Sequence, residues 1–312
     1  MIWYLLLILV TILLLLSAWI CYRLLFYNRN IKEQDIYVVP PGKQYENFAE
    51  AMLRNVDLLG KRSYEQIYIT ANDGVRLAGR YYHIKENAPV MIMFHGYHGN
   101  GIREFALLSQ IAESMGMNML IVDQRAHGKS GGHIISFGIK ERFDCVAWSH
   151  YAQKRFGEKV KIVLAGVSMG AATVLMASEL CLPESVSAII ADCPYSAPSR
   201  IIRKVGRDMK LPYYVLYPVA VAGAIIFGGF SIWSTSPVRA VRNTRIPILL
   251  IHGEEDRLVP CDMSMEIYRS CANFKQILTV PQAGHGVSCY ADTEKYKRKI
   301  LLFLQACKVI CI

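Results

Sequence analysis

Two patterns of hydrophobic positions alternate along most of the chain. Short runs rich in Ile, Val, Leu and Met predict strands, and several are apolar at nearly every position, as in parallel strands buried on both faces. The predicted strands lie at 66–70, 75–84, 90–95, 118–123, 160–165, 188–192, 246–252 and 276–280. Helical patterns lie between them, at about 102–116, 138–156, 169–181, 262–273 and 292–306. This order predicts an α/β domain with a mostly parallel central sheet, helices on both faces and a preceding antiparallel hairpin.

The N-terminal segment follows neither pattern. Residues 2–22 contain no charged side chain, and about 20 apolar residues suffice for a helix to cross a bilayer. Trp3 and Tyr4 lie at one end and Trp19 and Tyr22 at the other, where interfacial aromatic residues belong. A cleaved signal peptide is the alternative, but no Lys or Arg precedes the run and no clear small-x-small site closes it. We therefore expect an uncleaved transmembrane anchor over residues 1–22.

Basic residues follow this segment and predict its orientation. Arg23, Arg29, Lys32 and Lys43 come after the apolar run, so the positive-inside rule places the rest of the chain in the cytoplasm. The nine cysteines include no C-x-x-C pair, which fits a reducing compartment and argues against a disulfide scaffold or zinc module. Residues 23–62 form a polar juxtamembrane segment with one amphipathic helix expected at about 45–59.

Composition narrows the function classes. With 53% hydrophobic and 19% charged residues, the 312-residue chain is not a disordered protein. Its net charge of +10 could suggest a nucleic-acid partner, but the basic residues are dispersed and no nucleic-acid fold signature appears. A membrane is the partner that explains the charge better.

A G-x-S-x-G motif is the first sign of chemistry. The motif GVSMG (166–170) follows a predicted buried strand and opens a predicted helix. In this strand–turn–helix setting the motif forms a nucleophile elbow, whose strained turn requires small neighbours and exposes the serine hydroxyl. We therefore predict that Ser168 is a nucleophile.

A serine hydroxyl needs a base to take its proton and an acid to orient that base. Asp256 and His285 each follow a predicted strand, at the carboxyl edge where open α/β sheets place their ligands. The resulting order Ser168, Asp256, His285 predicts a catalytic triad. Asp192, at the end of the preceding strand, is the alternative acid.

An oxyanion formed at Ser168 would need preorganised donors. The backbone N–H of Met169 follows the nucleophile, and that of Tyr97 lies in the glycine-containing turn 95–100 after a predicted strand. His95, His98, His127 and His252 also lie in strand-end turns, and no H-E-x-x-H or H-x-x-E-H spacing is present. We expect them to be structural and predict no metal site.

Together these motifs resemble the α/β-hydrolase superfamily, and more closely its serine aminopeptidase-like group, which includes membrane-anchored members. The resemblance covers about residues 66–306 and rests on HGYHGN (95–100), DQRAHGKS (123–130), GVSMGA (166–171), HGEEDRLVP (252–260) and AGHG (283–286). Ala126 stands where the second motif usually has glycine. The resemblance implies a water-dependent acyl hydrolase over residues 63–312 without a metal or organic cofactor.

A second uncharged stretch covers residues 211–238. A single membrane crossing there would separate Ser168 from Asp256, so a working triad argues against one. We expect instead a cap insertion at about 195–240 that forms an apolar acyl pocket and reaches toward the bilayer. An ordinary pair of buried helices is the alternative.

The sequence thus predicts a membrane-anchored serine hydrolase that cleaves carboxylic esters or thioesters of a small-molecule or lipid-like apolar acyl group through an acyl-serine intermediate. Peptide or amide cleavage is the alternative reaction, because the same machinery serves both. A non-catalytic membrane scaffold is the alternative from another class. The sequence does not predict the oligomeric state.

Overall fold

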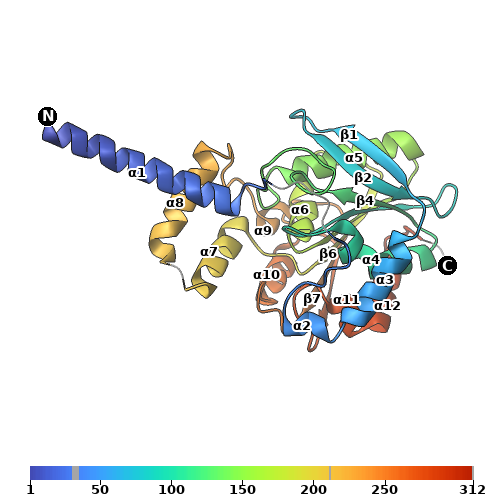
Figure 1. Ribbon diagram of the computed structural model, residues 1–312. Coiled ribbons are helices and arrows are strands. Elements are labelled where there is room, and N and C mark those ends of the chain that lie inside the picture. Colours follow the sequence, from blue (N-terminus) through green and yellow to red (C-terminus); the bar gives the residue numbers. More distant parts are fainter. Residues whose placement is uncertain (30–34, 211, 311–312) are drawn as a thin grey trace.

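An eight-stranded sheet lies at the centre of the computed structural model, which describes residues 1–29, 35–210 and 212–310 (Figure 1). Its strands, in sequence, are β1 (Glu65–Thr70), β2 (Arg76–Tyr82), β3 (Val90–Phe94), β4 (Asn118–Asp123), β5 (Ile162–Val167), β6 (Val186–Asp192), β7 (Ile248–Gly253) and β8 (Lys275–Val280). The spatial order is β1-β2-β4-β3-β5-β6-β7-β8. β1 and β2 pair antiparallel, β2 joins β4 antiparallel, and the other pairs are parallel. The predicted fold class is confirmed.

Continuous burial explains the apolar strands. Every residue of β3 and of β7 is buried, because helices cover both faces of the sheet. The register also aligns strand ends: Phe94 of β3 lies opposite Gly166 of β5. The loops that follow these two strands therefore start side by side at the carboxyl edge of the sheet.

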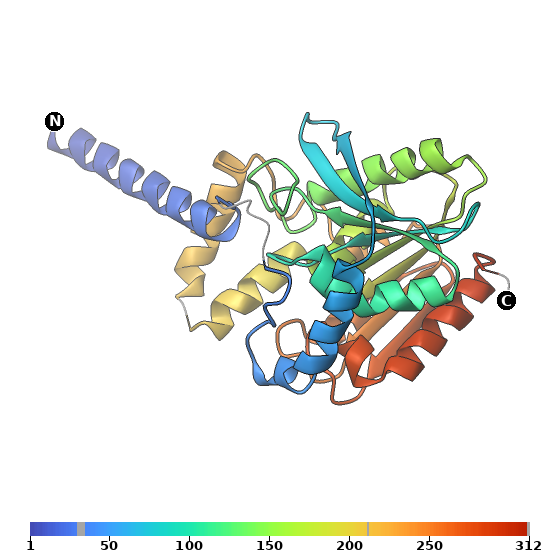
Figure 2. The ribbon, with the colours of Figure 1, turned by 45° about the vertical axis from the view of Figure 1, so that its right-hand side comes forward.

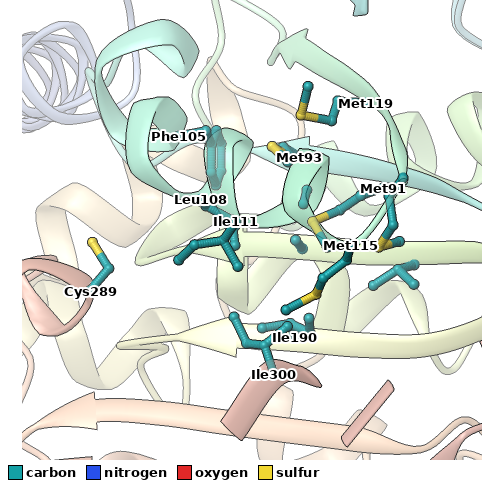
Figure 3. Close-up of a cluster of buried hydrophobic side chains, with 14 of the residues drawn as sticks. Met91, Met93, Phe105, Leu108, Ile111, Met115, Met119, Ile190, Cys289 and Ile300 are labelled. Carbon is teal, nitrogen blue, oxygen red and sulfur yellow. The ribbon is translucent and has the colours of Figure 1, made fainter. Parts of the chain in front are cut away.

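Helices form a layer on each face. One layer contains α3 (Ala49–Gly60), α4 (Gly101–Ser114), α11 (Ser288–Ala291) and α12 (Thr293–Ala306). Figure 3 shows part of the core beneath it, where Met91 and Met93 from the sheet lie near Phe105 and Ile111 from α4. The other layer contains α5 (Glu141–Phe156), α6 (Met169–Ala177), α9 (Pro237–Ala240) and α10 (Asp262–Ser270).

The helix expected at about 45–59 is divided in the structure into α2 (Lys43–Glu46) and α3. The chain turns at Phe48, whose ring lies 6.3 Å from that of Tyr290. Val56 and Leu59 of α3 are buried in the core next to α4. The turn thus lets α2 reach the carboxyl edge of the sheet while α3 packs on α4.

The N-terminal helix α1 (Ile2–Leu25) projects away from the sheet, and its C-terminal half lies beside α8 (Tyr213–Ile226) (Figures 1 and 2). Its 24 residues span about 36 Å, and among the described helices only α1 is long and apolar enough to cross a bilayer. The helices α1 and α8 touch closely, since a Cβ at Gly223 would lie 2.4 Å from the carbonyl oxygen of Ala18. An amphipathic helix, α7 (Pro198–Asp208), precedes α8.

Candidate active site

Ser168 lies in the turn between β5 and α6, with φ +55° and ψ −115°. This conformation is sparsely populated for a residue with a side chain and persists only where its surroundings fix it. A Cβ at Gly170 would lie 1.7 Å from the carbonyl oxygen of Phe94, and one at Gly166 would lie 2.4 Å from the carbonyl carbon of Gly170. The close approach of strand and helix therefore requires glycine at both positions of the motif.

Replacing Gly170 by alanine is expected to destabilise the fold by more than about 3 kcal/mol, because the new methyl group would overlap the backbone of β3. Gly206 offers a matched control within α7, since its Cβ would meet no atom closer than 3.6 Å. The free energy of unfolding of Gly206→Ala should therefore differ by no more than about 1 kcal/mol from that of the unmodified protein. Thermal unfolding in detergent measures both, and equal midpoints for the two variants would contradict the steric argument.

The structure brings the three predicted triad residues together. The Ser168 Oγ lies 2.9 Å from Nε2 of His285, and Nδ1 of His285 lies 2.6 Å from Oδ2 of Asp256. The other carboxylate oxygen of Asp256 accepts hydrogen bonds from the backbone N–H groups of Leu258 and Val259. In this arrangement the hydroxyl donates to the imidazole, whose other nitrogen donates to a carboxylate fixed on both oxygens.

The carboxyl group of Asp256 stays ionised although it is buried. Burial alone would raise its pKa, but hydrogen bonds from His252 and His285 lower the pKa to about 2. Ser264 and the carbonyl oxygen of Val259 hold the His252 ring, at 2.6 and 2.8 Å. Asp256 can therefore stabilise a positive charge that forms on His285.

Asp192, the alternative acid, occupies a different environment at the end of β6. Its Oδ2 accepts a hydrogen bond from the Tyr296 hydroxyl at 3.1 Å, and within the described residues its Oδ1 has no partner. Burial raises the pKa of Asp192 to about 6. Its backbone carbonyl accepts the N–H of Ser168 at 2.8 Å. Asp192 thus supports the elbow through its backbone, whereas the His285 ring hydrogen-bonds to Asp256.

Asp192→Asn is expected to stabilise the fold above pH 6. The folded-state pKa of Asp192, about 6, exceeds its ordinary value of 3.8, so the unfolded chain ionises first as pH rises between these values. Between pH 3.8 and pH 6 the free energy of unfolding of the unmodified protein therefore falls by about 3 kcal/mol, and that of the variant does not. Unfolding midpoints from pH 4 to pH 8 should diverge with rising pH. Midpoints that stay parallel throughout would contradict the prediction.

The two predicted oxyanion donors lie on adjacent loops. Tyr97 follows β3 and Met169 follows Ser168, and the aligned ends of β3 and β5 bring their loops together. A Cβ at Gly96 would lie 3.4 Å from that of Ser168, which shows how closely the first loop approaches. Within the described part of the chain, neither the Tyr97 nor the Met169 backbone N–H donates to a protein acceptor. Both N–H groups therefore remain candidates for the oxyanion donors.

Comparisons with known proteins agree with this geometry. The family described as α/β hydrolase fold matches residues 89–216, and the family described as serine hydrolase (FSH1) matches residues 208–291. The chain belongs to the α/β-hydrolase superfamily. The elbow of this hydrolase lies in the first match, and Asp256 and His285 lie in the second.

Individual relatives cover most of the hydrolase. It is 25% identical to an uncharacterized protein of Bacillus subtilis, over 72% of this chain and 74% of that one. It is 26% identical to an uncharacterized membrane protein of Saccharomyces cerevisiae, over 80% and 83% of the two chains. A solved esterase of Pyrococcus furiosus is 25% identical with a TM-score of 0.63, over 80% of this chain and 94% of that one.

Two histidines outside the candidate triad of the hydrolase hold its loops. His95 Nε2 accepts the backbone N–H of Gln124 at 3.0 Å, and His127 Nε2 accepts that of His98 at 3.1 Å. Burial lowers the pKa of His127 well below its ordinary value, so the ring stays a neutral acceptor. Ala126, where the family motif has glycine, has φ +63°, which explains the usual preference there.

A metal ion would have to compete with the triad. Among the described residues one group of potential ligands forms a compact set, namely Cys193, Asp256 and His285, with ligand atoms within 4.8 Å of one another. Two of these three side chains already hydrogen-bond to each other. The group that could hold an ion is therefore the group that orients His285.

An apolar cavity of about 500 Å³ opens beside Ser168. Its lining combines aromatic side chains from the loops near Ser168 with residues of α7, α8 and the last turn of α1. Its lining residues include Tyr97, Phe137 and Tyr195 near Ser168, Ile201 and Val205 on α7, Leu216 and Tyr217 on α8, and Cys21, Leu24 and Leu25 on α1. An acyl chain could lie in this cavity with its carbonyl group at Ser168.

Two contributions to the site could not be predicted from the sequence. Gln44 of α2 accepts the backbone N–H of His285 at 3.2 Å, although 241 residues separate them. Residues of α1 line the cavity, although their composition is that of a membrane helix. Neither contact follows from a local pattern, because each depends on how distant segments pack.

Proposed function

We propose that the hydrolase is a membrane-anchored serine esterase or thioesterase whose substrates carry an apolar acyl group. The observation that carries this proposal is the apolar cavity of about 500 Å³ that contains Ser168 in its wall. Cavities of this size and character bind apolar ligands and leave few polar groups to orient them. The carbonyl of a bound ester would then be the polar group nearest the nucleophile.

In the proposed mechanism, His285 takes the Ser168 proton as the hydroxyl attacks the ester carbonyl. Asp256 fixes the imidazole tautomer and stabilises the imidazolium ion. The N–H groups of Tyr97 and Met169 donate to the oxyanion of the tetrahedral intermediate. His285 then protonates the leaving alcohol or thiol. Water, deprotonated by His285, attacks the acyl-Ser168 carbonyl, and collapse of the second intermediate releases the acid.

The lining of the cavity favours esters over peptides. Arg203 is the one charged residue among the lining residues, and none of those in the described chain is acidic. A peptide amine would therefore find no carboxylate to bind it. The same triad could attack an amide, so the test of the proposal includes one.

Acyl-length dependence tests the proposal. We expect kcat/KM for p-nitrophenyl esters to rise with acyl length over several carbon atoms, since each buried methylene contributes about 0.8 kcal/mol. The acyl p-nitroanilide of the best chain length should react far more slowly, and Ser168→Ala should lose nearly all of the ester activity. A preference for the anilide would favour the amidase alternative. A lack of Ser168-dependent turnover would contradict the proposal.

We also propose that α1 anchors the protein with its sheet domain on the cytoplasmic side, as the basic residues after the apolar run indicate. The protein should then remain in the membrane fraction at alkaline pH. A glycosylation acceptor inserted before residue 1 should be modified, and one inserted at the C-terminus should not. The reverse pattern would overturn the orientation and leave the anchor in place.

A further inference from the structure

We propose that α1 forms one wall of the substrate site and that the acyl chain enters from the bilayer between α1 and the α7–α8 pair. The substrate class would then be a long-chain ester lipid resident in the membrane. This inference rests on the proposed function and specifies where its substrate comes from.

The first observation is that α1 lines the cavity. Cys21, Leu24 and Leu25, at the C-terminal end of α1, share the cavity wall with Met209 and Tyr213, which flank the α7–α8 connection. Ser168 lies in the same cavity. A chain that reaches Ser168 can therefore contact the anchor helix directly.

The second observation is that this end of α1 is fixed to the active-site loops. The Tyr97 hydroxyl donates to the carbonyl oxygen of Leu25 at 2.9 Å, and Tyr97 also carries a proposed oxyanion donor. The ring of Phe26 lies edge-on to Phe137 and Phe230, with centroids 5.8 and 5.4 Å away. The Asn28 amide donates to the carbonyl oxygen of Ala126 at 2.7 Å. The anchor is thus held against the site at several points.

The third observation is a group of residues typical of the bilayer interface at the level of the cavity. The Arg23 guanidinium lies 5.5 Å from the ring of Trp19 and 3.8 Å from that of Tyr27. Arginine and these aromatic residues are typical of the bilayer interface. Because Leu24 and Leu25 lie within this group, the cavity wall they form is at the depth of the ester groups of lipids.

The fourth observation is an apolar surface that continues from α1 onto its neighbours. Leu24 is 73% exposed and Met209 64% exposed although both line the cavity, so they lie at its mouth. On α8, Tyr214 is 78% and Val215 66% exposed. Since α8 packs along the membrane-spanning helix, acyl chains of the bilayer are the partner that can cover these side chains. The mouth therefore opens where lipid lies.

Leu25→Trp tests whether α1 forms a wall of the substrate cavity. The variant is made in the full-length protein and reconstituted in phosphatidylcholine vesicles. The larger side chain should fill part of the cavity and lower the ratio of kcat/KM for a dodecanoyl over an acetyl ester by at least about tenfold. Ile20→Trp is the matched control, because this residue lies on the same helix but does not line the cavity. It should leave the ratio unchanged. Equal ratios for the two variants would overturn the role of α1.

Met209→Asp tests whether the acyl chain enters the cavity from the bilayer. A charge at the mouth should lower several-fold the release of fatty acid from a long-chain diacylglycerol embedded in the vesicles. Leu302→Asp, a similar change at a 50% exposed position on α12, should have no effect. Equal rates for both variants would overturn access from the bilayer.

Failure of the inference and failure of the proposed function give different results. Labelling by a fluorophosphonate probe shows that each variant retains a folded, reactive Ser168. If neither substitution changed the rate of ester hydrolysis, the proposed esterase activity would be retained and the proposed entry of the acyl chain from the bilayer would be contradicted. An unmodified protein that labels but hydrolyses neither ester nor diacylglycerol would contradict the proposed function itself.

Discussion

Ser168→Ala is expected to lower kcat/KM for the best ester by on the order of 10⁵-fold, because the acyl-enzyme cannot form without the hydroxyl. The elbow should survive the change, since alanine keeps the Cβ that the turn at φ +55° already accommodates. Residual activity would come from the oxyanion donors and the cavity alone. The variant should also fail to react with a fluorophosphonate.

Ser178→Ala is a suitable control for this experiment. Ser178 follows α6, the helix that Ser168 opens, and its hydroxyl donates only to the carbonyl oxygen of Leu175. The loss of one such bond costs about 1 kcal/mol of stability and should not change the rate. If Ser168→Ala retained a rate comparable with that of Ser178→Ala, Ser168 would not be the nucleophile.

Asp256→Asn is expected to lower kcat by about 10⁴-fold with little change in the fold. An amide can replace the carboxylate in size but carries no charge to stabilise the His285 imidazolium. It can also donate to Nδ1 of His285, 2.6 Å from the present carboxylate oxygen, and so favour the wrong tautomer. Raising the pH should not restore the rate, because the amide does not ionise.

Asp192→Asn separates the two candidate acids. Asp192 is equally buried near the elbow, but its carboxylate faces Tyr296, so this variant should keep its rate within about tenfold. A severe loss in Asp192→Asn combined with a mild loss in Asp256→Asn would reverse the assignment of the acid. Circular dichroism and fluorophosphonate labelling show whether each variant is folded.

The sheet could be predicted from the sequence because its strands are buried on both faces. The near-continuous apolar runs of β3 and β7 arise from this burial, and the motif residues follow their ends in a fixed order. The turn that holds Ser168, the candidate nucleophile, could be predicted from the sequence as well. Close backbone contacts require glycine at positions 166 and 170, so the spacing of glycines in the motif follows directly from the geometry of the turn.

The chain order of the motifs favoured Asp256 as the acid, but the sequence alone left Asp192 as an alternative. Asp192 and Asp256 both follow parallel strands, and a strand-end position does not say where a carboxylate points. The loop after β7 turns Asp256 toward His285 and gives it two backbone donors, Leu258 and Val259. This geometry depends on the path of a short loop, which local patterns do not specify.

The division of the helix at Phe48 and the docking of α1 were also beyond local patterns. Residues 45–59 were expected to form one helix, but α3 begins only after Phe48, whose ring packs against Tyr290. The composition of α1 predicts a helix long and apolar enough to span a bilayer, but it does not predict the hydrogen bond from Tyr97 to Leu25. Side chains far apart in the sequence decide both.

If α1 anchors the protein as proposed, the contacts that join its end to the loops around Ser168 also limit how the sheet domain can turn relative to the membrane. Tyr97, Phe137 and Ala126 hold the last residues of α1 and those just after it, so the helix is not a free tether. In the proposed topology, these contacts would oppose rotation of the sheet domain relative to α1 and would keep the mouth of the cavity facing the bilayer at a constant depth. In the proposed topology, hydrolysis would draw on the cytoplasmic leaflet alone and would leave the opposite leaflet unchanged, producing an asymmetry in lipid number between the two.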